Sequence, residues 1–257
     1  MINTATCLKK VLDNSKADAV FLADNQKFVR KNESMRVNFS LINRRIADSF
    51  MDILCMGEET DRRYIGEVLD ANDVIRILKG PSALGVSHAA VPPQKSSATF
   101  LGLFKNGSDN GRARHFSISK AQIERAQNVV HSALAELSID CEYVEDGRIL
   151  YDAQNVLGLF SGPAHEATEE IVEMMDNTFA ERVPGAGRRK GTYPGRTSDT
   201  ISVTVMLSNL GQGAAMDKVE WFYKEATQMM GNSRDKRVNR EQRWDDVARA
   251  AELLPNL

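Results

Sequence analysis

Leu101-Gly-Leu-Phe104 recurs as Leu157-Gly-Leu-Phe160, and this repeat gives the clearest indication of the fold. Each copy ends a short apolar run of the kind that forms a buried strand. Each is followed by a loop, a segment with helical spacing of apolar residues, and a further β-branched run. Two β-α-β units in tandem give the order β-α-β-β-α-β, so the sequence predicts a ferredoxin-like α+β unit.

Both helices of this unit carry sequence signals at their starts. The first is predicted to begin at Ser119, because Ser119-Lys-Ala-Gln122 is a capping-box pattern. The second is predicted to begin near Pro163, since proline is favoured in the first turn of a helix. Apolar residues at helical spacing form one face of each helix: Ile123, Ala126, Val130, Leu134 and Leu137 in the first, and Ile171, Met174, Met175 and Phe179 in the second.

Shorter patterns place the remaining elements. Closing strands are expected at residues 139–144 and 201–207, and Asp146-Gly147 is a typical hairpin turn. A metal site beside that turn would need a further carboxylate on the strand at residues 98–104, which has none. Two additional C-terminal helices are predicted, at residues 214–230 and 239–254.

Residues 1–80 are predicted to form a β-rich N-terminal region. Runs rich in β-branched and aromatic residues at 19–22, 27–30 and 35–42 alternate with polar turns, which indicates a β meander. Residues 46–55 fit either a helix or a hairpin strand, and we favour the hairpin. Proline, glycine and serine accumulate in residues 81–97, which predicts a linker or long loop. The ferredoxin-like domain with its C-terminal helices then occupies residues 98–257.

Composition limits the classes of function. The chain has 257 residues, of which 42% are hydrophobic and 26% charged, as in ordinary globular proteins with a core. A formal net charge of -2 argues against a protein that is basic throughout, so any contact with phosphate must be local. No apolar run approaches the roughly 18 residues of a membrane helix, and no signal peptide is evident. Three scattered cysteines fit a reducing compartment, which predicts a cytoplasmic protein, or one in the host cytoplasm if it is viral.

The predicted fold brings two basic, glycine-containing loops to one edge of the sheet. These loops are residues 105–115 and 184–197. Arginine suits bidentate contacts with phosphate, and glycine lets a backbone approach closely. Tyr193 is placed to stack on an unpaired base, a contact worth about 1–3 kcal/mol. The predicted nucleic-acid-binding residues are Lys105, Arg112, Arg114, Arg182, Arg188, Arg189, Lys190, Tyr193 and Arg196.

The favoured function is therefore non-catalytic binding of single-stranded nucleic acid, with RNA preferred. Leu-Gly-Leu-Phe resembles the strand motifs of RNA-recognition modules, which stack bases on an open sheet, although Phe104 and Phe160 are expected to face the core. The alternative is a self-assembling structural protein, such as a viral or phage component. In that case the basic arm of one copy would lie on the acidic segment 136–181 of the next, giving a homo-oligomer. A further alternative is that the basic, glycine-containing stretch is a plain solvated loop with no binding role.

An enzyme is the least favoured class. Lys190 precedes Gly191, whereas a P-loop needs lysine directly after its second glycine. Motifs for a serine nucleophile, a Rossmann cofactor or a zinc peptidase are likewise missing from the sequence. No catalytic residue, cofactor or metal is assigned.

Overall fold

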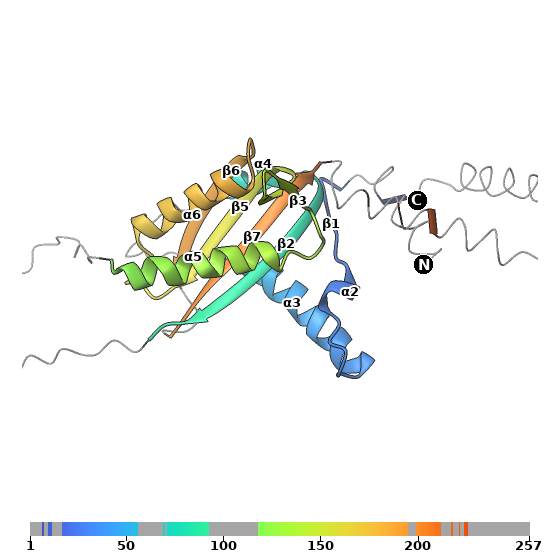
Figure 1. Ribbon diagram of the computed structural model, residues 1–257, viewed down its shortest axis with the longest axis horizontal. Coiled ribbons are helices and arrows are strands. Elements are labelled where there is room, and N and C mark those ends of the chain that lie inside the picture. The colour runs from blue at the N-terminus through green and yellow to red at the C-terminus, as the bar shows by residue number, and fades with distance from the viewer. Residues whose placement is uncertain are drawn as a thin grey trace, which may run out of the picture.

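The central feature of the fold is a mixed five-stranded sheet with strand order β1-β2-β7-β5-β6 (Figure 1). The computed structural model describes residues 7, 10–11, 17–55, 69, 71–92, 118–194, 199–211, 217, 221 and 224–225. β7 pairs antiparallel with β2 and β5, and the outer pairs β1–β2 and β5–β6 are parallel. The strands are β1 (Ala19–Phe21), β2 (Gly80–Ala90), β5 (Ala153–Gly162), β6 (Gly187–Pro194) and β7 (Thr200–Leu210).

Helices cover both faces of this sheet. Figure 1 shows α5 and α6 lying side by side across one face, whereas α3 lies on the other side and extends beyond the sheet. β3 and β4 form a separate two-stranded hairpin. These elements are α2 (Asn25–Phe28), α3 (Met35–Cys55), α4 (Ala71–Ile77), α5 (Lys120–Ala135), α6 (Glu169–Arg182), β3 (Glu142–Glu145) and β4 (Arg148–Tyr151).

The central strands are buried on both faces because each face packs against helices. Successive side chains of a strand point to opposite sides of the sheet. In β5, Val156 and Phe160 lie in the core cluster under α5 and α6, while Leu157 and Leu159 lie in the cluster that includes residues of α3 and α4. The long runs of buried residues in β5 and β7 are the result.

α3 replaces the last run of the predicted β meander and the hairpin predicted at 46–55, and α2 overlaps the run at 27–30. The predictions of strands at 27–30 and 35–42 and of a hairpin at 46–55 are therefore wrong, whereas the run at 19–22 contains β1. The Ser34 hydroxyl accepts a hydrogen bond from the Val37 amide at 3.3 Å, close to the start of the helix. Asn38, Ser49 and Asp52 are buried along the helix together with Ile42 and Ile53, at helical spacing. Polar residues thus occupy core-facing positions, so the spacing of the apolar residues alone does not show the helical period.

The buried polar groups of α3 are paired. The Asn38 amide bonds to the backbone of the preceding loop at Arg30 and Glu33. Asp52 accepts a 2.8 Å hydrogen bond from the Thr204 hydroxyl of β7. Burial of these groups is tolerated because their hydrogen bonds are satisfied inside the protein.

Several predicted elements are confirmed. α5 has both hydrogen bonds of the capping box between Ser119 and Gln122. Its predicted apolar face is buried except for Ile123, which is partly buried, and Asp146-Gly147 forms the hairpin turn with φ values of 50° and 72°. α6 begins at Glu169 rather than near Pro163, because residues 163–167 first form a turn.

The ferredoxin-like prediction with a β-rich N-terminal region is wrong. The strand expected at 139–144 contributes only to the exposed β3–β4 hairpin and does not join the sheet. Instead the sheet uses β2, from the predicted linker, and β6, from the predicted loop. The division of the chain into domains at residues 81–97 stays a prediction. The first Leu-Gly-Leu-Phe copy and most of the predicted C-terminal helices lie outside the described residues. Within the described part of the chain, no helix is long and apolar enough to cross a membrane.

Gly85 allows α5 to lie directly on β2. A Cβ atom at this position would lie 2.1 Å from the backbone carbonyl oxygen of Ala133 in α5. We therefore expect Gly85→Ala to lower the free energy of unfolding by about 1–3 kcal/mol, as overpacked cores do. Chemical denaturation measures the change. His88→Ala, exposed on the same strand, is the control and should stay within about 0.5 kcal/mol of wild type. Equal stabilities for Gly85→Ala and wild type would contradict this packing.

Candidate functional site

The basic residues that the sequence singled out lie on β6 at the edge of the sheet. β6 pairs with β5 through residues 187–194, so this segment is a strand and not a loop. Strand alternation sends Arg188 and Lys190 to the α6 side and Arg189 to the α4 side. The three cations therefore do not converge on one surface.

Arg188 and Lys190 share one acidic partner on α6. The Arg188 Nε atom and the Lys190 Nζ atom each lie 3.2 Å from Oδ1 of Asp176. The three side chains are between 21% and 35% exposed, so the pairs are partly shielded from water. Asp176 belongs to the acidic segment noted in the sequence, which was predicted to meet the basic arm of another copy. The structure shows that contact within one chain.

Arg189 and Arg182 have partners on two other elements. The Arg189 Nε atom lies 3.3 Å from Oδ1 of Asp73 in α4. An Arg182 guanidinium nitrogen donates a 2.9 Å hydrogen bond to the carbonyl oxygen of Ile149 in β4. β6 is thus linked by charge to a helix on each side of the sheet, and the end of α6 is linked to the hairpin.

Chemically, this arrangement is a cluster of ion pairs on an edge strand, in which two aspartates are the partners of three cations. Charged side chains on an edge strand discourage pairing with a foreign strand. Ion pairs of this exposure contribute modestly to stability, about 0.2–1 kcal/mol each. Across the described residues there is no group of three or more His, Cys, Asp or Glu side chains that could hold a metal ion. The described geometry therefore supports a structural role for the basic strand.

The other predicted site residues are dispersed. Tyr193 is 7% exposed and packs in the core cluster with Leu157 and Met206. Lys105, Arg112, Arg114 and Arg196 lie outside the described residues. Asp73 is not recognisable as a partner from the sequence, because nothing local marks an aspartate that meets an arginine 116 positions later. Asp176 could have been found as a partner from the acidic run alone.

The sequence matches a known family over most of its length. The family model is described as "Tubulin-like CetZ, C-terminal domain" and matches residues 32–228. The chain is also similar to tubulin-like protein CetZ1 of Haloferax volcanii, with 23% identity over 200 residues. That alignment covers 75% of this chain and 48% of CetZ1, so the chain spans about half the length of this relative.

Solved structures share the fold. CetZ2 from Haloferax volcanii, in a GTPγS-bound protofilament, gives a TM-score of 0.67 at 21% identity, covering 90% of this chain and 57% of that chain. TubZ from Bacillus thuringiensis serovar israelensis, in a GTPγS-form protofilament, gives a TM-score of 0.54 at 16% identity, covering 97% of this chain and 56% of that chain.

These comparisons overturn the predicted function. Single-stranded nucleic-acid binding, with RNA as the partner, is wrong, because the family and the fold are those of tubulin-like proteins. A viral or phage component gains no support from these relatives. A homo-oligomer is compatible with relatives that were solved as protofilaments.

Asp176→Asn tests the ion-pair cluster. The change removes the charge that Arg188 and Lys190 share, so we expect the free energy of unfolding to fall by about 1 kcal/mol at low salt. The difference from wild type should shrink in 1 M salt, where the screening length is only about 3 Å. Urea denaturation at both salt concentrations measures this. Glu173→Gln, an exposed acid on the same helix, is the control. A salt-independent loss in Asp176→Asn would contradict an electrostatic origin.

We expect His131 on α5 to make the stability of the protein depend on pH. Burial, and secondarily the positive charge of Arg182, lowers the pKa of His131 below its usual value of 6.5. The unfolded chain therefore takes up this proton more readily, so the stability is complete above about pH 6.5 and is lost as the pH falls. We expect wild type to lose more stability than His131→Gln between pH 7.5 and 5.5, values that bracket the usual pKa of about 6.5, in urea denaturation. Parallel losses in the two proteins would exclude His131 as the source.

Proposed function

This chain belongs to the tubulin-like CetZ C-terminal domain family, and we propose that it associates with copies of itself into filaments of the protofilament type. The family match over residues 32–228 carries the proposal. The structural likeness to CetZ2 and TubZ subunits, both solved as protofilaments, supports it. The chain spans about half the length of this relative, CetZ1. Filament formation is therefore proposed for this chain and is not taken over from the relatives as a fact.

The outward sides of α3 and α4 supply a candidate contact surface. Leu54 of α3 is 68% exposed and Ile75 of α4 is 64% exposed, while Met51 of α3 is 46% exposed. The neighbouring residues Ile53 and Ile77 belong to one buried cluster, which joins the two helices. A contiguous exposed apolar patch is typical of a surface that a partner covers, and we propose that these side chains form one. A head-to-tail filament uses two different patches on each subunit, and we propose this surface as one of them.

Guanine nucleotide is a separate part of the proposal. One similar structure is a GTPγS-bound protofilament and another, CetZ1 from Haloferax volcanii, is a GDP-bound monomer. We propose that assembly depends on which guanine nucleotide is present. A cytoplasmic location fits a protein of this kind and is proposed with it.

Sedimentation velocity over a wide range of protein concentration tests self-association. We expect the weight-average sedimentation coefficient to rise with concentration. Leu54→Lys/Ile75→Lys places two charges in the proposed surface and should weaken association at least about tenfold, as loss of central interface contacts does. Circular dichroism checks that both proteins fold.

Ser40→Lys/Asn177→Lys is the matched control, because it adds the same charge at exposed positions of α3 and α6. A wild-type chain that stays monomeric at all concentrations would contradict the proposal. Repeating the series with GTPγS and with GDP tests the nucleotide separately. Identical size distributions with both nucleotides would contradict that part and leave the self-association intact.

A further inference from the structure

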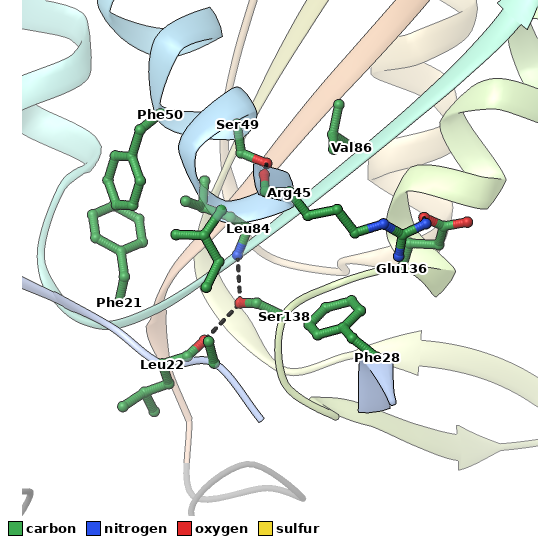
Figure 2. Close-up of a pocket in the computed structure, with 12 residues that line it drawn as sticks. Phe21, Leu22, Phe28, Arg45, Ser49, Phe50, Leu84, Val86, Glu136 and Ser138 are labelled. Carbon is green, nitrogen blue, oxygen red and sulfur yellow. Dashed lines mark hydrogen bonds and ion pairs between the residues drawn. The ribbon is translucent and has the colours of Figure 1, made fainter. Parts of the chain in front are cut away.

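A cavity of about 320 Å³ lies between α3 and the β1–β2 side of the sheet (Figure 2). Its walls come from four places in the chain: α3, the segment from β1 to α2, β2, and the turn that follows α5. The cavity is separate from the ion pairs of β6, since none of those side chains lines it. Pockets that bind small molecules start at about 300 Å³.

Three phenylalanine rings form part of the wall. Phe21 of β1 and Phe50 of α3 pack edge to face, with ring centroids 4.7 Å apart and an interplanar angle of 81°. Figure 2 shows this pair on one side of the cavity and Phe28 of α2 on the other. Leu84 and Val86 of β2 add aliphatic surface to the wall. Such a lining offers ring faces and edges to a flat apolar ligand.

The hydroxyl groups in the wall are already engaged. The Ser138 hydroxyl donates a 2.6 Å hydrogen bond to the carbonyl oxygen of Leu22 and accepts a 3.0 Å bond from the Leu84 amide. The Ser49 hydroxyl donates a 3.0 Å bond to the carbonyl oxygen of Arg45 within α3. A water molecule needs two to four polar partners to be held in a cavity, so these walls favour an apolar occupant over ordered water.

Charge is confined to one ion pair in the wall. Arg45 lies 2.8 Å from Glu136, which follows the last turn of α5, and both side chains are about 40% exposed. The Arg45 guanidinium also lies over the Phe28 ring, 5.4 Å from its centroid. Because the two charges neutralise each other, they do not select a charged ligand.

We propose that this cavity is a binding site for an uncharged, flat aromatic molecule of about two fused rings. The volume matches a ligand of that size, since an engineered apolar cavity of about 150 Å³ holds a single benzene ring. The rings of Phe21, Phe28 and Phe50 set the preference for an aromatic ligand. A bound molecule would contact both α3 and the sheet and so fix their separation.

Titration with prodan, an uncharged naphthalene fluorophore, tests this site on the intact chain. We expect saturable binding with one site per chain and a blue shift of the emission. Ser49→Leu fills the cavity without removing a needed hydrogen-bond donor and should weaken binding at least about tenfold. Ser40→Leu, the same change at an exposed position of α3, should bind as wild type does.

Mapping the prodan-binding site on the wild-type protein keeps the test independent of how the variants fold. In amide NMR spectra, prodan should shift the signals of Leu22, Leu84 and Ser138. Shifts confined to the exposed side of α3, or equal affinity in Ser49→Leu and wild type, would overturn the proposal. Binding that does not saturate would also overturn the proposal. Because the titration is read at a concentration where the chain is not associated, its result is independent of filament formation.

Discussion

The pairing of β7 with both β2 and β5 is the constraint on which the rest of the structure depends. β7 lies between two strands that are far apart in the sequence, and it is antiparallel to both. Its backbone is hydrogen-bonded on both edges, and its side chains are buried on both faces over most of its length. α5 and α6 cover one face and α3 covers part of the other, and Thr204 meets the buried Asp52 there. Each helix is held where it is by this packing.

The sequence predicts the elements whose signals are local. α5 is found because Ser119 and Gln122 form a capping box and the apolar residues that follow keep a helical period. β7 and the Asp146-Gly147 turn are found for similar reasons. α3 is missed because Asn38, Ser49 and Asp52 occupy core positions, and their partners lie in a loop, in the same helix and on a distant strand.

β2 and β6 are missed because their compositions are typical of loops. Pro81 and Gly85 suggest a break in regular structure, yet Gly85 is required by the close approach of α5 to β2. β6 is rich in glycine and cations, and its charges make sense only once α4 and α6 bring Asp73 and Asp176 alongside. The sequence shows the cations of β6, and only the tertiary structure shows that Asp73 and Asp176 pair with them.

Ser138 ties together three segments that are far apart in the chain, and this bears on the order of folding. Its hydroxyl joins Leu22 to Leu84 across sequence separations of 116 and 54 residues, and its carbonyl oxygen accepts from the Asp24 amide. Contacts over such separations form late, because loop closure must come before they contribute. β1 has three residues of its own and relies on this bridge. We therefore expect the segment around β1 to dock after α5 and the central strands have assembled, and to exchange its amide hydrogens sooner than β7 does.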